Sequence, residues 1–441
     1  MRAEWVECPA GGARSAAARV RGMIPPSGSV AAAAGAIVAD VRARGDAAVA
    51  EYEQRFAPVK GPDPAGPERG IPRELEPRVE GSGPFRVGEA ELAASLEALD
   101  PAVRAALEVA RENVGAVAEA GLGVDAEVTL RQGQTVRLRE VPVRRAAVYA
   151  PGGRAPYPSS VVMGVMTARA AGVDEVVVCA VRHPVILAAA ALCEADEVYA
   201  MGGAQAVAAL AYGTQSVGAV DVIVGPGNAY VQEAKRLVSG AVGIDGFAGP
   251  SDLVVLASEG ADPALAALDL LAQAEHGEDS PVVAVSADEQ WLDDVAVEIG
   301  ARIKARPTVA QAPCALVHAA DLETALAFTE AFAPEHLELH GADAEALAPR
   351  IRTAGCLFVG VHAGTAFGDY VAGSNHTLPT DGAARFASGL SVRHFTRRMA
   401  EVHLDAAAAS ALAPHGAAIA RAEGFPVHAE SMEVREDAGH A

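Results

Sequence analysis

The stretch Arg145-Ala-Ala-Val-Tyr-Ala-Pro-Gly-Gly153 joins a short apolar run to a glycine-rich turn, and a helical pattern follows it. Short β-branched runs and helical stretches then alternate along the chain. The predicted strands are residues 146–149, 175–179, 197–200 and 220–224, and the predicted helices are residues 159–171, 184–193, 204–212 and 228–239. This alternation predicts a doubly wound parallel sheet.

A second alternating series begins near Asp252. Its predicted strands are residues 253–256, 282–285, 315–317, 337–339 and 357–359, with helices between them. We therefore predict an α/β fold of two tandem Rossmann-like doubly wound domains, with small helical segments at both ends of the chain.

The expected domain boundaries place residues 33–148 and 253–395 in a first α/β domain and residues 149–252 in a second. Residues 1–32 are expected to form a helical segment. Residues 396–441 are expected to form a helical tail for dimerisation, because its Ala-rich helices have little apolar bulk of their own and need another surface.

Three further segments have recognisable patterns. Residues 57–87 are rich in proline and glycine, which predicts an exposed, loosely structured insertion. Asp100-Pro101 is a typical helix start, and we expect that helix to run to Gly121. A hairpin is predicted at residues 128–143, turning around Gly133.

The composition is that of a soluble protein of more than one domain. The 441 residues are 51% hydrophobic, 21% charged and 4% aromatic. A net charge of −22 repels phosphate backbones and anionic lipid, so we expect no nucleic-acid or membrane partner. No secretory signal and no apolar run of transmembrane length is evident, so a cytoplasmic location is expected. The five cysteines have no close pair, which argues against a disulfide framework or a cysteine metal site.

Glycine-rich turns follow three strands of the first predicted sheet. They are Tyr149-Ala-Pro-Gly-Gly153, Met201-Gly-Gly-Ala-Gln205-Ala206 and Gly225-Pro-Gly-Asn228-Ala-Tyr230. Such turns let a backbone approach a phosphate at a helix N-terminus. Each is also compatible with a plain turn. A Gly-x-Gly-x-x-Ala match at residues 121–126 follows a helix, so we treat it as chance.

The segment Leu270-Leu-Ala-Gln273-Ala-Glu-His276-Gly277 has the pattern of a helix end capped by glycine. Gln273 and His276 are three residues apart and so share one helix face. An amide oxygen and an imidazole nitrogen could there form half of a zinc site. A solvent-facing polar helix end is the alternative.

Several motifs together closely resemble those of the histidinol dehydrogenase family. They are the three turns above, Ala-Gly-Pro-Ser251-Asp, Gln273-Ala-Glu-His276-Gly, Pro-Glu335-His336-Leu, Gly-Asp369-Tyr, Ser-Asn375-His376-Thr-Leu-Pro-Thr and Glu423-Gly-Phe-Pro-Val-His428. The resemblance runs from about residue 45 to 435. It implies an aldehyde-dehydrogenase-like scaffold and a homodimer with shared active sites.

The resemblance also implies the reaction and the cofactors. The family oxidises L-histidinol through L-histidinal to L-histidine with two NAD+, the last steps of histidine biosynthesis, and a zinc ion holds the substrate. By resemblance, Glu335 activates water and His336 is the general base. The other implied positions are Gln273, His276, Asp369 and His428 for zinc; Ser251, His376 and Glu423, with His336 and the zinc ligands, for substrate; and Tyr149, Gln205 and Asn228 for NAD.

The chemistry requires these residue types independently of the resemblance. Hydride leaves a carbon as the hydroxyl proton is removed, so a base that titrates near neutrality is needed, and histidine suits that role. The aldehyde must be hydrated before a second oxidation, and Glu335 next to His336 supplies a carboxylate for that step. An imidazole-and-amine substrate could add two nitrogens to four protein ligands, giving a six-coordinate zinc that mainly positions the substrate.

The sequence departs from the family pattern at a few positions, and two alternative functions remain open. Asp252 stands where the family usually has Glu, Ser374 where Thr is frequent, and residues 179–184 form a shortened loop. A relative that oxidises another alcohol, such as a sulfonated diol, would differ first in its substrate contacts. A zinc hydrolase would also use zinc and a carboxylate-activated water, but it leaves the glycine-rich turns unexplained.

Overall fold

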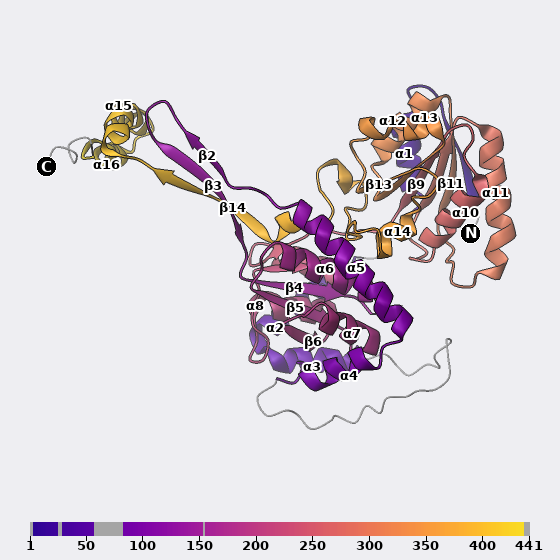
Figure 1. Ribbon diagram of the computed structural model, residues 1–441, viewed down its shortest axis with the longest axis horizontal. Coiled ribbons are helices and arrows are strands. Elements are labelled where there is room, and N and C mark those ends of the chain that lie inside the picture. The colour runs from indigo at the N-terminus through magenta and orange to yellow at the C-terminus, as the bar shows by residue number, and fades with distance from the viewer. Residues whose placement is uncertain (1–2, 25–28, 57–82, 153–154, 436–441) are drawn as a thin grey trace. The chain divides into compact units, whose positions relative to one another are not determined.

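The computed structural model describes residues 3–24, 29–56, 83–152 and 155–435. The chain divides into two compact units. The first unit comprises Met1–Gly121 with Arg144–His394, and the second comprises Leu122–Val143 with Phe395–Ala441. The first unit contains two parallel sheets with helices between their strands, which confirms the predicted α/β class (Figure 1).

A five-stranded parallel sheet has the strand order β6-β5-β4-β7-β8. Its strands are β4 (Arg145–Ala150), β5 (Glu175–Ala180), β6 (Glu197–Ala200), β7 (Val222–Val224) and β8 (Gly243–Ile244). The first four were predicted from the sequence. The three glycine-rich turns follow β4, β6 and β7, so they meet at the carboxyl edge of this sheet, as expected.

Helices cover both faces of this sheet. One face packs against α2 (Ala31–Arg44), α3 (Asp46–Arg55), α8 (Gly203–Tyr212) and α9 (Ala229–Val238). The other carries α4 (Glu89–Glu97), α5 (Pro101–Ala120), α6 (Pro158–Ala170) and α7 (Pro184–Leu192). The expected grouping of residues 33–148 with 253–395 is therefore wrong, because the buried side chains of α2 pack against the sheet built by residues 145–244.

A six-stranded parallel sheet has the order β1-β11-β10-β9-β12-β13. Its strands are β1 (Ala3–Cys8), β9 (Leu253–Ala257), β10 (Val282–Ser286), β11 (Cys314–Ala319), β12 (His336–His340) and β13 (Cys356–Val359). Helices α1 (Ala13–Arg21) and α12 (Leu322–Phe332) cover one face, and α10 (Pro263–Gln273) and α11 (Glu289–Arg302) cover the other.

The N-terminal segment differs from the helical expectation for residues 1–32. Residues Ala3–Cys8 form an edge strand that pairs in parallel with β11, and Val6 and Cys8 are buried in the core below it. The pairing partner, residues 314–319, is distant in the sequence, so local periodicity did not reveal this strand.

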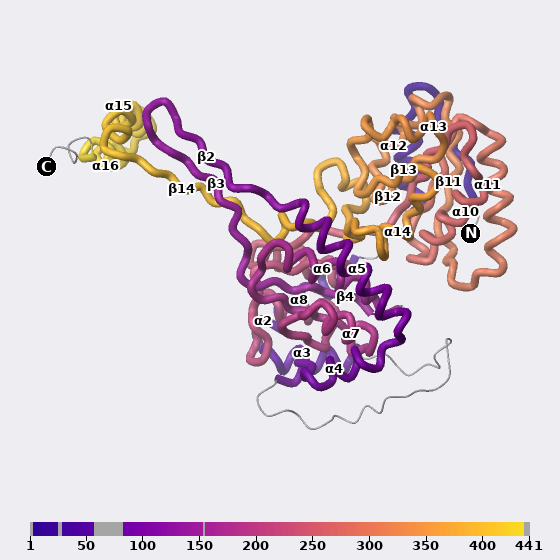
Figure 2. Tube along the Cα trace, viewed as in Figure 1, coloured from indigo at the N-terminus to yellow at the C-terminus, as the bar shows by residue number. Residues whose placement is uncertain are grey.

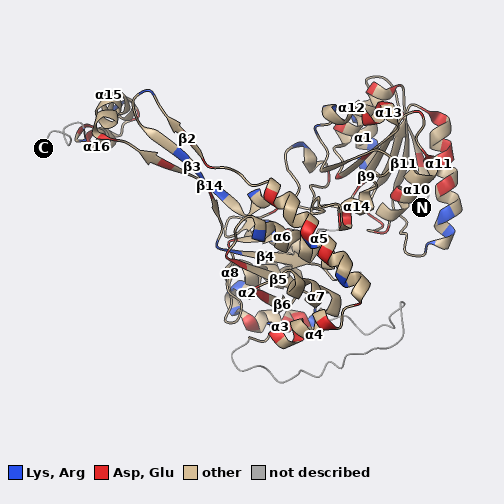
Figure 3. Cartoon of the chain, in the orientation of Figure 1, with Lys and Arg blue, Asp and Glu red and all other residues tan. Residues whose placement is uncertain are grey.

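Several short elements complete the first unit. They are α13 (Ala342–Glu345), α14 (Thr365–Tyr370) and the 3-10 turns Ile303–Ala305, Ala348–Arg350, Ala383–Arg385 and Val392–His394. Asp and Glu residues are spread over outer helices such as α3, α4 and α11, in keeping with the net charge of −22 (Figure 3).

The second unit is an antiparallel sheet followed by two helices (Figure 2). Strands β2 (Ala126–Thr129) and β3 (Thr135–Pro142) form the predicted hairpin around Gly133, and β14 (Thr396–His403) pairs with β3. Helices α15 (Ala406–Ala422) and α16 (Pro426–Glu433) pack on each other. The tail therefore begins as a strand, because pairing with β3 satisfies its backbone groups.

The predicted insertion at residues 57–87 lies mostly outside the described residues. Its last part is not exposed: Phe85 and Val87 are buried, and they pair with β6 through Val87 N to Val198 O at 2.8 Å and Ala200 N to Phe85 O at 2.7 Å. The five cysteines are free thiols, and four of them are buried.

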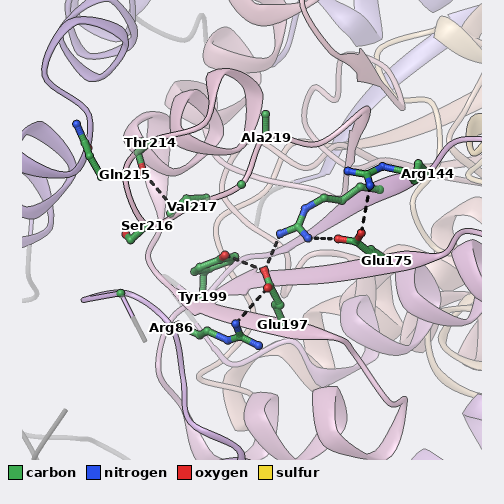
Figure 4. Close-up of a pocket in the computed structure, with 13 residues that line it drawn as sticks. Arg86, Arg144, Glu175, Glu197, Tyr199, Thr214, Gln215, Ser216, Val217 and Ala219 are labelled. Carbon is green, nitrogen blue, oxygen red and sulfur yellow. Dashed lines mark hydrogen bonds and ion pairs between the residues drawn. The ribbon is translucent and has the colours of Figure 1, made fainter. Parts of the chain in front are cut away.

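An arginine–glutamate network lies at the amino ends of β4, β5 and β6 (Figure 4). Arg145 pairs there with Glu175 and, at 2.6 Å, with Glu197. These residues border a cavity of about 740 Å³. None of the predicted site residues lines it, so this edge of the sheet is separate from the expected chemistry.

Candidate active site

The centre of the candidate site is the pair Glu335–His336 at the start of β12. Both residues are buried, with 5% and 2% of their surfaces exposed. Glu335 N donates to Asp252 Oδ1 at 2.8 Å, and Asp252 N donates to Glu335 Oε2 at 3.0 Å. These reciprocal bonds join the start of β12 to the start of β9, so the pair lies at the amino edge of the six-stranded sheet.

The protein environment shifts the pKa values of both Glu335 and His336. Burial raises the pKa of Glu335 to about 7. Burial by itself lowers the pKa of His336, but the nearby Glu335 and Asp369 carboxylates outweigh it and raise that pKa to about 9. A buried carboxyl that titrates near neutrality, next to an imidazole, is suited to acid–base catalysis.

The hydrogen bonds of His336 select one ring nitrogen for chemistry. Nδ1 lies 3.0 Å from the Asp252 carbonyl oxygen, which accepts its proton. Nε2 has no hydrogen-bond partner among the described residues and lies 3.6 Å from Asp369 Oδ1. In the neutral ring, Nε2 therefore carries the lone pair that could accept a proton.

Residues with candidate metal-ligand atoms lie next to this pair. Gln273 ends α10, and its Nε2 donates to Ser251 Oγ at 2.7 Å, while the Ser251 hydroxyl donates to Glu335 Oε2. This chain of bonds orients the amide and leaves Gln273 Oε1 buried with no hydrogen-bond partner among the described residues. Asp369 of α14 lies close by, and its Oδ2 is 4.0 Å from His276 Nε2.

The atom types that these residues offer fit the zinc ion expected from the sequence. A buried amide oxygen without a donor, an imidazole nitrogen and a carboxylate are ligand types that zinc accepts. Burial by itself raises the pKa of Asp369, but its interactions with His336 and the other nearby imidazoles lower it overall, which keeps the group ionised. Three of the four predicted ligands, Gln273, His276 and Asp369, are thus brought together.

The remaining predicted substrate residues lie in different places. His376 belongs to the same site region, with Nδ1 2.9 Å from the Asp369 carbonyl and Nε2 3.1 Å from Ser160 Oγ. Glu423 and His428 lie in the second unit and are exposed there. The His428 ring is 5.3 Å from that of Phe425. These two residues are not part of the group described above.

The residues expected to contact NAD support the turns of the five-stranded sheet. Tyr149 is buried, and its hydroxyl accepts from Gly203 N at 3.0 Å. Gln205 Nε2 donates to Glu53 at 2.9 Å. Asn228 Oδ1 caps α9 by accepting from Tyr230 N at 3.0 Å. Gly225 has φ +115°, and a Cβ there would be 2.1 Å from Tyr149 O, so only glycine fits this turn.

The sequence did not reveal a buried ion pair next to Glu335. Arg21 of α1 donates to Asp252 Oδ2 at 2.7 Å and to Phe332 O at 2.9 Å. The Asp252 side chain is fully buried. Asp252 was noted only as a departure from Glu, and Arg21 lies in the segment outside the resemblance. No sequence signal linked them.

Together, the fold and this site define an α/β enzyme with a buried acid–base pair beside oxygen and nitrogen donors suited to a metal. Comparisons with known proteins give the family. The histidinol dehydrogenase family model matches residues 26–436. Histidinol dehydrogenases of Cereibacter sphaeroides and Nocardia farcinica are each 43% identical, over 412 and 424 residues, and these matches cover 91% of this chain and 91% and 90% of the relatives.

A solved structure of histidinol dehydrogenase from Elizabethkingia anophelis superposes with a TM-score of 0.85 at 27% identity, covering 96% of this chain and 97% of that one. The chain belongs to the histidinol dehydrogenase family and is an oxidoreductase, which confirms the resemblance read from the motifs. None of the described helices combines the length and apolarity needed to cross a bilayer.

Proposed function

We propose that this enzyme oxidises L-histidinol through L-histidinal to L-histidine in two NAD+-dependent steps, with a zinc ion in the site. The single observation that carries the proposal is the Ser251 link. Ser251 bonds to both Glu335 and the Gln273 amide nitrogen, and so leaves the buried Gln273 oxygen without a hydrogen-bond donor among the described residues.

When bound, zinc would hold the imidazole and amine of the substrate and offset the charge of Asp369, while NAD+ would accept the hydride. Gln273, His276, Asp369 and His428 are the proposed zinc ligands. With the Asp369 charge offset, the pKa of His336 would be lower than about 9, which would favour the neutral ring whose Nε2 can act as a base.

His336 then serves both oxidations. In the first, Nε2 takes the hydroxyl proton as the carbon loses hydride. Glu335 next takes a proton from water, which adds to the aldehyde, and His336 removes a hydroxyl proton from the hydrated aldehyde in the second oxidation. The balance is one water consumed, two hydrides transferred and a carboxylate formed with release of three protons. The pKa of Glu335 near 7 suits a group that exchanges a proton with water.

We further propose that NAD+ binds at the glycine turns of the five-stranded sheet, near Tyr149, Gln205 and Asn228. Helix α8 begins at Gly203, and its N-cap Gly202 makes no side-chain capping bond, which supports phosphate binding at this N-terminus. Ser251, His376 and Glu423 are proposed substrate contacts. The protein is proposed to be a cytoplasmic homodimer in which His428 and Glu423 complete the partner's site.

The function is tested by NADH formation with histidinol, compared with other amino alcohols and with sulfonated diols. Activity with a diol and none with histidinol would contradict the substrate assignment. The division of roles is tested by Glu335→Gln, which should retain much of the alcohol step and lose the aldehyde step, whereas His336→Ala should damage both. Equal loss on both steps in Glu335→Gln would contradict the proposed role of Glu335.

A further inference from the structure

A second polar cluster, buried except for the half-buried Asp269, lies near the site and has no role in the reaction described above. It consists of Asp269 on α10, Glu338 and His340 on β12, and Thr365 at the start of α14. Glu338 is fully buried, and His340 and Thr365 are each 4% exposed. Ligand-type atoms of the two acids and the histidine lie within 4.8 Å of one another.

Glu338 is the hub of this cluster. Its Oε1 accepts from both the backbone N–H and the hydroxyl of Thr365, each at 2.7 Å. Its Oε2 lies 3.2 Å from His340 Nε2. Burial, followed by the charge of Glu338, raises the pKa of Asp269 to about 7, so Asp269 can hold a proton and donate it to Glu338.

The cluster repeats the arrangement of the site on the same three elements. Asp269 is one helical turn before Gln273 on α10, and Thr365 is one turn before Asp369 on α14. Glu338 is two residues after His336 on β12. Residues four apart share a helix side, and residues two apart share a strand face. The cluster and the site therefore form two neighbouring rows across α10, β12 and α14.

Helix α14 depends on an outside partner because it has only 6 residues. Its N-cap, Gly364, offers no side-chain acceptor for the free N–H groups of the first turn. The Glu338 carboxylate supplies one, and its negative charge also suits a helix N-terminus. A Cβ at Gly364 would be 3.1 Å from Asp269 Oδ1, so α10 approaches the same helix start closely.

We propose that Glu338 is a positioning residue, which through Thr365 and Asp269 fixes α14 and α10 on β12 and so holds Asp369 and Gln273 beside His336. The inference rests on the proposed function, because it concerns two of the proposed zinc ligands. Removing contacts that support metal ligands, made by residues that do not touch the metal, commonly weakens metal affinity about 10- to 100-fold.

The test measures zinc affinity of the full-length protein by competition with a chelator, together with kcat and KM for histidinol. Glu338→Gln should weaken zinc binding about 10-fold or more. Thr365→Val removes only the hydroxyl donor at nearly constant shape and should also weaken it, whereas Thr365→Ser retains the donor and should bind like the wild type. Equal affinities of the Val and Ser variants would overturn the proposal.

A matched control separates positioning from general damage to the core. Thr329 on α12 is also buried, at 1% exposure, but its hydroxyl bonds to Ala325 O within its own helix. Thr329→Val should therefore leave zinc affinity unchanged. A loss in Thr329→Val equal to that in Thr365→Val would also overturn the proposal.

Two further outcomes separate this inference from the proposed zinc site. If Asp369→Ala retains wild-type zinc affinity, the proposed zinc site is wrong. If Asp369→Ala loses zinc while Glu338→Gln and Thr365→Val retain it, only the positioning proposal fails. One zinc per chain is expected; a second zinc that disappears in Glu338→Gln would show that the cluster itself binds metal and would overturn the positioning role.

Discussion

Replacing Arg21 with methionine should destabilise the first unit around Glu335 and His336, because the Asp252 carboxylate would stay buried without its cation. Arg21 lies 2.7 Å from Asp252 Oδ2, and the Asp252 side chain has no exposed surface. Leaving one partner of a buried ion pair alone costs about 3 to 5 kcal/mol. Since Glu335 N still donates to Asp252 Oδ1 at 2.8 Å, we expect the low end, about 3 kcal/mol.

The same change should cost much less in the Asp252→Asn background. Asparagine retains an oxygen for Glu335 N but carries no charge, so Arg21→Met then loses mainly the bond to Phe332 O at 2.9 Å, worth about 1 kcal/mol. The expected coupling between the two positions is therefore about 2 kcal/mol. The cost of Arg21→Met should also be smaller in mildly acidic than in mildly alkaline buffer. Burial already raises the pKa of Asp252, and losing the guanidinium raises it further, so the carboxyl takes a proton.

Hydrogen exchange of the β9 and β12 amides, followed by mass spectrometry, measures the local opening free energy that this reasoning concerns. Arg19→Met is the matched control. Arg19 lies on the same helix and pairs with Glu4, but both side chains are about half exposed, at 55% and 45%, so the expected cost is below about 1 kcal/mol. If Arg21→Met lowers the local opening free energy equally when residue 252 is Asp and when it is Asn, the buried-charge explanation is refuted.

Three further predictions concern the metal, the dimer and pH. His276→Ala and Asp369→Ala should each abolish activity and lower the zinc content measured by elemental analysis, because a site that loses one ligand binds less tightly; full occupancy would exclude these residues as ligands. Co-expressed His428→Ala and His276→Ala chains should recover about a quarter of wild-type activity under random pairing, since half the dimers are mixed and each has one intact site; verified mixed dimers without activity would contradict a shared site. The pKa of Asp269 is raised to about 7, so the contribution of this group to stability is fully present at low pH and is lost as pH rises through about 7; Asp269→Asn should remove this part of the pH dependence of Tm, and an unchanged slope would count against it.

The strands and helices of the parallel sheets were largely predictable because their signals are local. Apolar runs such as 175–179 and 282–285 alternate with helical patterns, and the structure has β5 and β10 there. The exceptions depended on distant pairing. Strand β1 was missed because its hydrogen-bond partner is β11, and β14 was read as helix because its partner is β3.

The sequence by itself determined the fold class and the family, because these follow from local patterns and from motifs with fixed spacing. It also predicts Glu335, His336, Gln273, His276 and Asp369 as site residues. Only the tertiary structure decided how these residues are supported. Arg21 with Asp252, Ser251 with Glu335, and Glu338 with Thr365 join residues far apart in the chain. Each such bond forms only when folding buries both partners in one place, and burial is also what gives the bond its strength and shifts the pKa of the buried acids.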